Sequence, residues 1–523
     1  MNFPDQMPEE NLGIILRPAH SLLALESGGQ RIVAEMVSDA IALAGESALA
    51  AQTRFKIGET ELCEPDYRQC LHWASSLGLA SEDFLERLLK PPGEESQRSN
   101  STLIEDGQIL KIFWDGDLLP IARFDLITQL QTQSLFCVGG LSHLDLSHVP
   151  NLTELNCSSR RITELDLSPV PNLTKLDCSE TGITELDLSR VPNLTKLSCS
   201  ETGINEIDLS HVPNLTSLDC SEKGITELDL SRVPNLTYLR CFSTGITELD
   251  FSHVPNLTRL NFWDTDIAEL DLSYVPNLTE LNCSSRRITE LDFSHVPNLS
   301  SLNCSDTKIT ELDLSLVPNL TELHCFSTRI TELDLSHVPH LTDLNCCRTK
   351  ITQLDLSHVP DLTRLDCSYT RITELDLSPV SNLTSLHCSH SEITTLDLSP
   401  VSNLTSLYCS YTGITQLDLS HVPNLGSLSY SPRRITELDL SPVPNLTALA
   451  CYNPKISPEE ELLRRIFGEQ ISKLDLSHVP NLTFLSCKNS GITELDISSL
   501  ASLEHFFYDK SSTRLIQRPD QNF

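Results

Sequence analysis

The cysteines are the residues of this sequence whose type and spacing first suggest chemistry. Of 18 cysteines, 14 recur at one position of a repeating pattern, mostly 21 residues apart, from Cys157 to Cys487. Regularly spaced thiols can bind metals, form disulfides or fill a core. Phe262 and Tyr430 take the same position in two copies, and neighbouring strands place side chains about 4.8 Å apart, wider than the roughly 3.8 Å that a disulfide favours. We therefore predict free buried thiols, and no metal or cofactor.

Two columns of carboxylates and a set of histidines recur with the same spacing. Glu164 and Asp166 return as Glu185 and Asp187, and like charges about 5 Å apart in water repel by about 1 kcal/mol before screening. We interpret these columns as a solvated face, with a row of divalent-cation sites as the alternative. The histidines of LSHVP, such as His337, are predicted to be turn residues. No phosphate loop, nucleophile elbow or metal-ligand motif occurs, so we predict that the protein is not an enzyme.

The elements that position these residues belong to one internal repeat. The tripeptide LDL or a variant returns every 21 residues from Leu144 to Leu438, and then at Leu474 and Leu495, which makes 17 copies. Each copy has an alternating LxxLxC segment, typical of a short strand, and closes with Val-Pro-Asn, where proline disfavours helix. One coil buries too little apolar surface to fold alone, so we predict a stack of coils about 4.8 Å apart.

Variation among the copies marks positions that are free to contact a partner. The outward residues of the cysteine strand change at nearly every copy, whereas TELDLS scarcely changes. Exposed Trp, Tyr and Arg anchor protein interfaces, so we predict a partner-contact site centred on Tyr238 to Trp263, with incidental drift as the alternative. Its residues are Tyr238, Arg240, Phe242, Arg259, Asn261, Trp263, His324, Phe326, Arg348, Arg364, Tyr408 and Tyr452.

A basic strip, one residue per copy at the end of the cysteine strand, is a second candidate surface. The chain has 37 basic and 72 acidic residues and a net charge of -35, so the strip would either receive an acidic peptide or offset the carboxylate columns. This net charge repels nucleic acid, and no run of about 18 apolar residues suggests membrane contact. We expect a protein partner and leave the oligomeric state open. The strip consists of Arg287, Lys308, Arg329, Lys350 and Arg371.

The full pattern, LxxLxCxxTxITxLDLSxVPNL, resembles the leucine-rich-repeat family. Within that family it resembles the bacterial 21-residue type with a cysteine column, that of the listerial internalin J repeats, over about residues 135–497. The resemblance implies a solenoid whose cysteine strand lies on the concave face. Internalins also carry secretion signals and wall anchors that are not recognisable here, so a role as a surface adhesin is not implied. The family's inward asparagine is mostly threonine, and in places a cation: Thr181, Thr202, Thr244, Thr307, Arg160 and Lys223.

The patterns divide the chain into regions and give its fold class. Residues 1–90 are predicted as a helical module, 91–134 as a linker and β-hairpin cap, 135–497 as the solenoid with a helical insertion at about 453–471, and 498–523 as a C-terminal cap and tail. The predicted fold class is therefore α+β. It combines a leucine-rich-repeat solenoid of stacked short parallel strands with a mostly helical N-terminal module.

These features predict a non-catalytic scaffold that binds a protein through the concave face. The alternative is a bacterial effector or virulence factor delivered into a host cell, where it could serve as a ubiquitin-pathway adaptor. Bacterial ubiquitin ligases with leucine-rich repeats use a cysteine nucleophile, but around Cys63 their catalytic domain has no recognisable counterpart. The N-terminus, MNFPDQMPEEN, lacks the pattern of a secretory signal, which favours a cytoplasmic location over secretion into a host cell without a classical signal.

Overall fold

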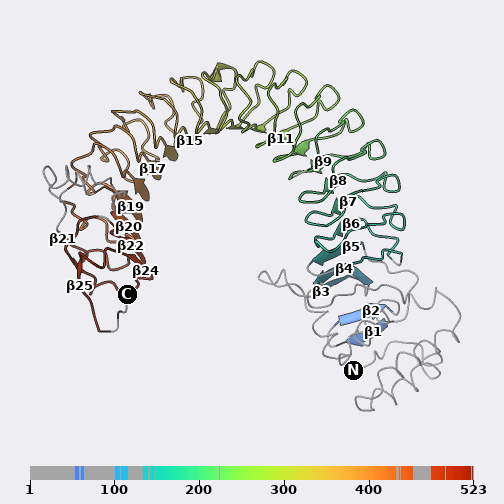
Figure 1. Cartoon of the computed structure of the whole chain (residues 1–523), viewed down its shortest axis with the longest axis horizontal. Helices are drawn as coiled ribbons and strands as arrows, with labels where there is room; N and C mark the ends of the chain where they lie inside the picture. The colour runs from blue at the N-terminus through green and yellow to red at the C-terminus, as the bar shows by residue number, and fades with distance from the viewer. Residues whose placement is uncertain are drawn as a thin grey trace, which may run out of the picture. The chain divides into compact units, whose positions relative to one another are not determined.

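The computed structural model of the 523-residue chain describes most of its repeats and parts of both flanks. These residues belong to two compact units, the first within Met1–Leu257 and the second within Thr258–Phe523. In each unit the parallel strands of the main ladder lie along one side of a stack of coils, and the loops project from the other side (Figure 1). The described residues are 54–57, 60–63, 101–105, 108–115, 133–138, 142–147, 149–222, 224–431, 435, 437–451, 473–488, 490–519 and 521.

The first unit is a ladder of short parallel strands, one per coil. Neighbouring strands pair in the register of the repeat, so that Leu176 lies beside Leu197. A hairpin extends the ladder: β3 (Ser101–Glu105) is antiparallel to β4 (Gln108–Asp115), and β4 is parallel to β5. This pairing confirms the hairpin that the sequence predicts. The parallel strands are β5 (Ser134–Val138), β6 (Glu154–Asn156), β7 (Lys175–Asp177), β8 (Lys196–Ser198), β9 (Ser217–Asp219) and β10 (Tyr238–Arg240).

The second unit has the same construction, and Leu323 lies beside Leu344 in its ladder. A separate three-stranded parallel sheet contains β21 (Lys473–Leu474), β23 (Glu494–Asp496) and β25 (Arg514–Ile516). The ladder strands are β11 (Arg259–Asn261), β12 (Glu280–Asn282), β13 (Ser301–Asn303), β14 (Glu322–His324), β15 (Asp343–Asn345), β16 (Arg364–Asp366), β17 (Ser385–His387), β18 (Ser406–Tyr408), β19 (Ser427–Tyr430), β20 (Ala448–Cys451), β22 (Phe484–Ser486) and β24 (His505–Phe507).

The predicted fold class, α+β, is wrong. In the part of the chain that the structure describes there is no α-helix, and the single helical turn there is the 3-10 turn η1 (Leu314–Leu316). Within the expected helical module, β1 (Arg54–Ile57) and β2 (Thr60–Cys63) pair antiparallel instead. Apolar and polar residues alternate along RFKIGETELC, which favours strands over helix. The rest of residues 1–90 and the insertion at about 453–471 lie outside the described residues. The described coils form a parallel β-solenoid.

The core of each coil is built from the apolar positions of the repeat. In the coil of β14, Leu323, Cys325, Ile330 and Val338 have no exposed surface. Phe262, which replaces a cysteine, is equally buried, so this position accepts any apolar side chain that fits. Because a single coil has no inside of its own, its apolar side chains are covered by the coils on either side.

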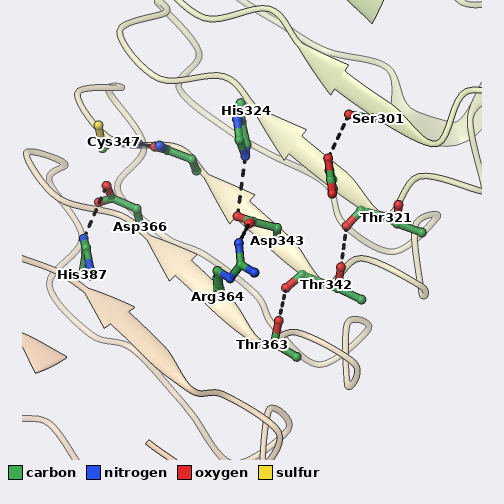
Figure 2. A network of polar contacts seen from close by, with 12 residues as sticks. Ser301, Thr321, His324, Thr342, Asp343, Cys347, Thr363, Arg364, Asp366 and His387 are labelled. Carbon is green, nitrogen blue, oxygen red and sulfur yellow. Dashed lines mark hydrogen bonds and ion pairs between the residues drawn. The ribbon is translucent and has the colours of Figure 1, made fainter. Parts of the chain in front are cut away.

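Threonines join neighbouring coils along the edge of the ladder. The Oγ1 atom of Thr342 donates to the carbonyl of Thr321 at 3.0 Å, and Thr363 donates to Thr342 at the same distance (Figure 2). The backbone N–H of the residue after each threonine bonds to the same carbonyl, as Asp343 does to Thr321 at 3.2 Å. This pattern explains why threonine recurs in PNLT.

A second threonine column fills the inward position that is asparagine in the family pattern. Thr307 Oγ1 donates to the carbonyl of Cys304 at 2.7 Å. The expectation that Arg160 takes this position is wrong, because Arg160 is exposed and Ser159 before it is buried instead. In the matching coil, Ser285 donates to two carbonyls of the preceding coil. Lys223 lies outside the described residues.

The repeated Asp-Leu-Ser turn accounts for one of the carboxylate columns. Asp355 Oδ1 accepts the backbone N–H of Ser357 at 2.9 Å, and the same bond recurs in coil after coil, as at Asp334 with Ser336. The hydrogen bonds that Ser357 donates lower the pKa of Asp355 below its ordinary value of 3.8. The aspartates are therefore exposed and also part of the turn. Within the described part of the chain, no helix has the length and apolar character to span a bilayer.

Candidate functional site

The strand face is the surface formed by the outward side chains of the parallel ladder. In each coil these are the first and third residues of the strand and the residue after the cysteine position. On β14 the outward residues are Glu322 and His324, and the buried Leu323 lies between them. Strand alternation therefore puts most of the sequence-predicted partner residues on this face. Tyr452 lies outside the described residues.

In the first unit, the predicted residues Tyr238, Arg240 and Phe242 lie on β10 and just after it. Phe242 is only 8% exposed. The guanidinium carbon of Arg240 is 4.5 Å from the centre of the Phe242 ring, and its Nη1 atom is 3.4 Å from Asp219 Oδ2 of β9. Phe242 is thus a largely buried support for Arg240, where the sequence suggests an exposed anchor.

The remaining residues of the predicted centre, Arg259, Asn261 and Trp263, belong to the second unit. Trp263 is 38% exposed and is the large aromatic side chain of this set. The Asn261 side chain, half-buried, accepts the backbone N–H of Trp263 at 3.4 Å. The centre of the predicted partner-contact site is therefore divided between the two units, and the arrangement of its residues is described separately in each.

A network of ionic groups crosses the strand face from β14 to β17 (Figure 2). Asp343 is bound from both sides, with Oδ1 3.6 Å from Nε2 of His324 and Oδ2 3.1 Å from Nη1 of Arg364. One coil further on, Asp366 Oδ2 lies 3.9 Å from Nδ1 of His387. These pairs are partly exposed, so each adds at most about 1 kcal/mol of stability. Their effect is to orient Arg364 and the imidazoles on the surface.

Aromatic rings continue the strand face beyond this network. The rings of His387 and Tyr408 lie 4.3 Å apart and are tilted by 59°. The Tyr408 hydroxyl is 3.0 Å from the Ser427 hydroxyl of β19. His387 therefore has a carboxylate on one side and an aromatic ring on the other. The predicted residues His324, Arg364 and Tyr408 thus lie on strands of one continuous ladder, from β14 to β18.

A stack of four side chains, which we call the ring ladder, runs beside the strand face of the second unit. The Arg348 guanidinium carbon lies 5.1 Å from the ring centre of Tyr369. The ring of Tyr369 stacks on that of His390, and His390 on Tyr411, with 4.1 Å between centres in both cases. Burial between the tyrosines lowers the pKa of His390 below its ordinary value of 6.5. Only Arg348 of these four was predicted from the sequence.

All four residues of the ring ladder have left-handed backbone conformations. Their φ angles are 55° for Arg348, 56° for Tyr369, 57° for His390 and 61° for Tyr411. For large side chains this region of φ is unfavourable. The same position is left-handed in other coils, where it holds residues such as Glu180, Ser243 and Asp264, so the conformation belongs to the repeat.

The basic strip lies two residues beyond the ring ladder in each coil. Its members alternate with buried threonines, as Lys350 follows Thr349, whose Oγ1 donates to Cys346. Arg287 is paired, with its Nε atom 2.6 Å from Asp266 Oδ1. The other four members are exposed, and among the described residues no carboxylate lies within ion-pair distance of them: Lys308, Arg329, Lys350 and Arg371.

The cysteines of the solenoid are chemically quiet. Burial raises the pKa of Cys325 to about 12, and the thiols of most coils are as deeply buried. Cys347, on the strand face, is half-buried, and desolvation, followed by the nearby Asp366 carboxylate, raises its pKa to about 11. In the part of the chain that the structure describes, no group of three or more His, Cys, Asp or Glu residues is arranged to hold a metal ion.

Comparison with known proteins identifies a relative of this chain among solved structures. No protein-family model matches the chain, and curated proteins give no match. The functional domain of internalin J from Listeria monocytogenes, which includes a cysteine ladder, is 36% identical, with a TM-score of 0.55 over 63% of this chain and 70% of that one. The chain belongs to the leucine-rich-repeat family.

Two more distant leucine-rich-repeat structures share the fold of this protein. A leucine-rich-repeat protein of Leptospira interrogans is 17% identical, with a TM-score of 0.50, and covers 68% of this chain and 89% of its own. The Arabidopsis receptor kinase HAESA, solved with the peptide hormone IDA and the co-receptor SERK1, is 16% identical, with a TM-score of 0.52, and covers 78% of this chain and 80% of its own. At these identities only the architecture carries over.

Sequence reasoning missed Tyr369, His390 and Tyr411 in this leucine-rich-repeat protein. Each lies two residues after the cysteine position, and the sequence shows them 21 residues apart. That spacing alone was a signal, because residues one repeat apart become neighbours in a solenoid. The position follows the strand, so strand alternation does not predict where its side chains point.

Proposed function

We propose that this leucine-rich-repeat protein is a scaffold that binds a protein partner through the strand face from β14 to β18. The observation that carries the proposal is the gathering of Arg364, Tyr408 and two partly exposed histidines on that stretch, beside the ring ladder. Arg and Tyr are the side chains that most often dominate binding energy at protein interfaces. Solenoids of this kind present extended surfaces for such contacts.

The experiment compares capture of partners by two matched double variants of the full chain. In the first, Arg364→Ala and Tyr408→Ala remove the anchors from the strand face. In the second, Arg232→Ala and Tyr274→Ala remove the same residue types from exposed positions in Val-Pro turns. Proteins captured from a lysate of the source organism by the wild type and the turn variant, and lost with the strand-face variant, support the proposal. Equal capture by all three proteins refutes it.

Cys347 offers a direct footprint of the same surface. Its thiol is half-buried on the strand face, close to Asp366. A partner bound from β14 to β18 should slow its alkylation several-fold, measured by mass spectrometry of the tryptic peptide. Unchanged alkylation in the complex would place the partner elsewhere.

We further propose that the protein works in a reducing compartment such as the cytoplasm. The support is the number of buried cysteines in the described coils, which carry free thiols. Oxidising compartments favour disulfides. Quantification of thiols in protein isolated under acid quench tests this, and extensive disulfide formation in the isolated protein would contradict it.

A further inference from the structure

We propose that the four unpaired cations of the basic strip and the ring ladder beside them form one docking edge for an extended acidic segment of a partner protein. The docking edge consists of Lys308, Arg329, Lys350, Arg371, Arg348, Tyr369, His390 and Tyr411. This inference rests on the proposed function, because it names the chemistry of the partner. The docking edge is a different surface from the strand face, because it lies beyond the ends of the strands.

The ion pairs of the second unit distinguish the two interpretations of the basic strip. If the strip served only to offset the acidic columns, its members would be paired with carboxylates. Arg287 is paired in this way, with Asp266. The next four cations are exposed and, among the residues that the structure describes, have no carboxylate within ion-pair distance. These four therefore offer charge to a ligand.

Packing like charges in a row has a cost that a ligand would remove. Neighbouring coils place the four cations about 4.8 Å apart, and unit charges at that separation in water repel by about 1 kcal/mol per pair. The protein has a net charge of -35, so a row of four cations on neighbouring coils is a local departure from its overall negative charge. An acidic segment laid along them would reverse the sign of this interaction.

The ring ladder favours an acidic peptide over a nucleic acid. Proteins that hold single-stranded nucleic acid stack the bases on free aromatic faces. Here the rings are stacked on each other, with planes 10° apart for Tyr369 and His390 and 21° apart for His390 and Tyr411. Both faces of His390 are therefore covered, and a base has no room to insert. The net charge of the chain further disfavours a polyphosphate.

The exposed parts of the stacked rings suit carboxylates instead. Tyr369 is 46% exposed although its faces are covered by Arg348 and His390. What remains accessible is the ring edge and the hydroxyl. The edge of an aromatic ring is the positive end of its quadrupole, and the hydroxyl donates hydrogen bonds. Both attract carboxylate oxygens, so the rings and the cations favour the same ligand.

The length of the docking edge sets the size of the ligand. The three intervals between Lys308 and Arg371 span about 14 Å at the spacing of a parallel ladder, which is about four to five residues of extended chain. Side chains on one side of an extended peptide lie about 6.8 Å apart. Two or three alternating acidic residues therefore fit the four cations.

The test measures binding of a fluorescein-labelled decapeptide of alternating Glu and Ser to the full chain by anisotropy. A Gln-Ser decapeptide is the uncharged probe. The variant K308Q/R329Q/K350Q/R371Q removes the four unpaired cations of the strip, and R160Q/R190Q/R232Q/R286Q removes the same charge from exposed arginines outside the strip. We expect at least ten-fold weaker binding for the strip variant, wild-type binding for the control variant, and weaker binding at higher salt.

The ring ladder has its own variant in the same assay. Tyr369→Asn and Tyr411→Asn together should weaken binding of the Glu-Ser peptide several-fold, since asparagine suits the left-handed backbone and leaves the cations in place. Equal binding of the peptide by the wild type and the strip variant would overturn the proposal. So would tighter binding of oligo-dT than of the peptide, or a strip-dependent self-association in sedimentation, which would make a second copy the occupant.

The outcome of this peptide-binding assay is independent of the outcome of the capture experiment that tests the proposed function. Peptide binding needs no natural partner and does not involve Arg364 or Tyr408. Loss of capture by the strand-face variant with no peptide binding would leave the scaffold function in place and overturn only the docking edge. Peptide binding that depends on the strip, with capture unaffected by the strand-face variant, would support the docking edge and refute the strand face.

Discussion

The ring of Tyr369 lies flat against the ring of His390, 4.1 Å between centres and 10° between planes, although both residues have positive φ. The coil spacing makes this contact possible, because residues one repeat apart lie side by side in a ladder. A left-handed conformation costs a large side chain roughly 1 to 2 kcal/mol, and an aromatic pair returns about 0.5 to 1.5 kcal/mol. These two effects nearly cancel, so stability alone does not explain the aromatic residues.

We predict that Tyr369→Asn and His390→Asn change the free energy of unfolding by less than about 1 kcal/mol each, because relief of backbone strain offsets the lost stacking. Urea melts of the two variants and the wild type measure this. The same substitutions at the buried Leu365 position, Leu365→Asn, should be strongly destabilising and serve as the positive control. A loss above about 2 kcal/mol in either ring variant would indicate a structural role.

His390 should titrate below pH 6.5, because burial between the tyrosines disfavours its charged form. Its pKa is lower in the folded than in the unfolded state, so the stability it contributes is present above pH 6.5 and is lost as the pH falls through its folded pKa. NMR titration of the imidazole measures the value. In the variant Tyr369→Ala with Tyr411→Ala, the pKa should rise toward 6.5, and an unshifted value in the wild type would contradict the stack.

Cys347 should react with iodoacetamide slowly at pH 8 and about ten times faster for each unit of pH up to about 11, the pKa to which desolvation and Asp366 raise it. Three units below that pKa, only about one thiol in a thousand is ionised. Asp366→Asn removes the second cause and should increase the rate at pH 8 a few-fold. Peptide mapping after short labelling measures both rates. A rate at pH 8 typical of an exposed cysteine would contradict the half-buried position.

Cys451 and Cys487 should form a disulfide when the protein is refolded from urea in the presence of glutathione disulfide, because both thiols are accessible before the core closes over them. Their Sγ atoms are 3.1 Å apart, at the end of β20 and directly after β22, two strands that pair in parallel. The two thiols lose two protons and two electrons, and glutathione disulfide is reduced to two molecules of glutathione. The cross-link should raise the free energy of unfolding by about 2 to 4 kcal/mol. Cys451→Ser is the control, and unmodified thiols after prolonged treatment would contradict the close approach.

The inward threonine column should contribute through its hydrogen bond. Thr349 is buried, and its Oγ1 donates to the Cys346 carbonyl at 2.7 Å. Thr349→Val keeps the shape and removes the donor, so we expect a loss of about 1 kcal/mol in the free energy of unfolding. Thr331 is an exposed threonine and serves as the control. Thr331→Val should change the free energy of unfolding by less than about 0.5 kcal/mol. Equal effects in chemical denaturation would show that the hydrogen bond is not stabilising.

Sequence reasoning succeeded where a pattern is both local and repeated. Strand alternation predicted that Leu323 and Cys325 point inward and His324 outward, and the structure agrees. It failed at RFKIGETELC, a short alternating segment inside the residues predicted as a helical module, which forms two antiparallel strands instead. In that region there is no second copy whose pattern would have corrected the first.

The candidate site was less predictable, because it depends on contacts between coils. That Phe242 is covered by Arg240 cannot be inferred from either residue type alone. The ring ladder requires the left-handed backbone at one turn position, which places Tyr369, His390 and Tyr411 in line. Residue spacing gives the column, but the direction of its side chains follows from a dihedral angle that the amino-acid types disfavour.

The common register of the coils has a consequence for how this surface can change over time. A gene that gains or loses one whole 21-residue unit by unequal recombination restores every threonine and leucine contact on either side of the junction. The same event adds or removes one cation and one ring position from the docking edge. Ligand length and binding strength can therefore be altered in discrete steps by copy number, while the protein remains folded at every step.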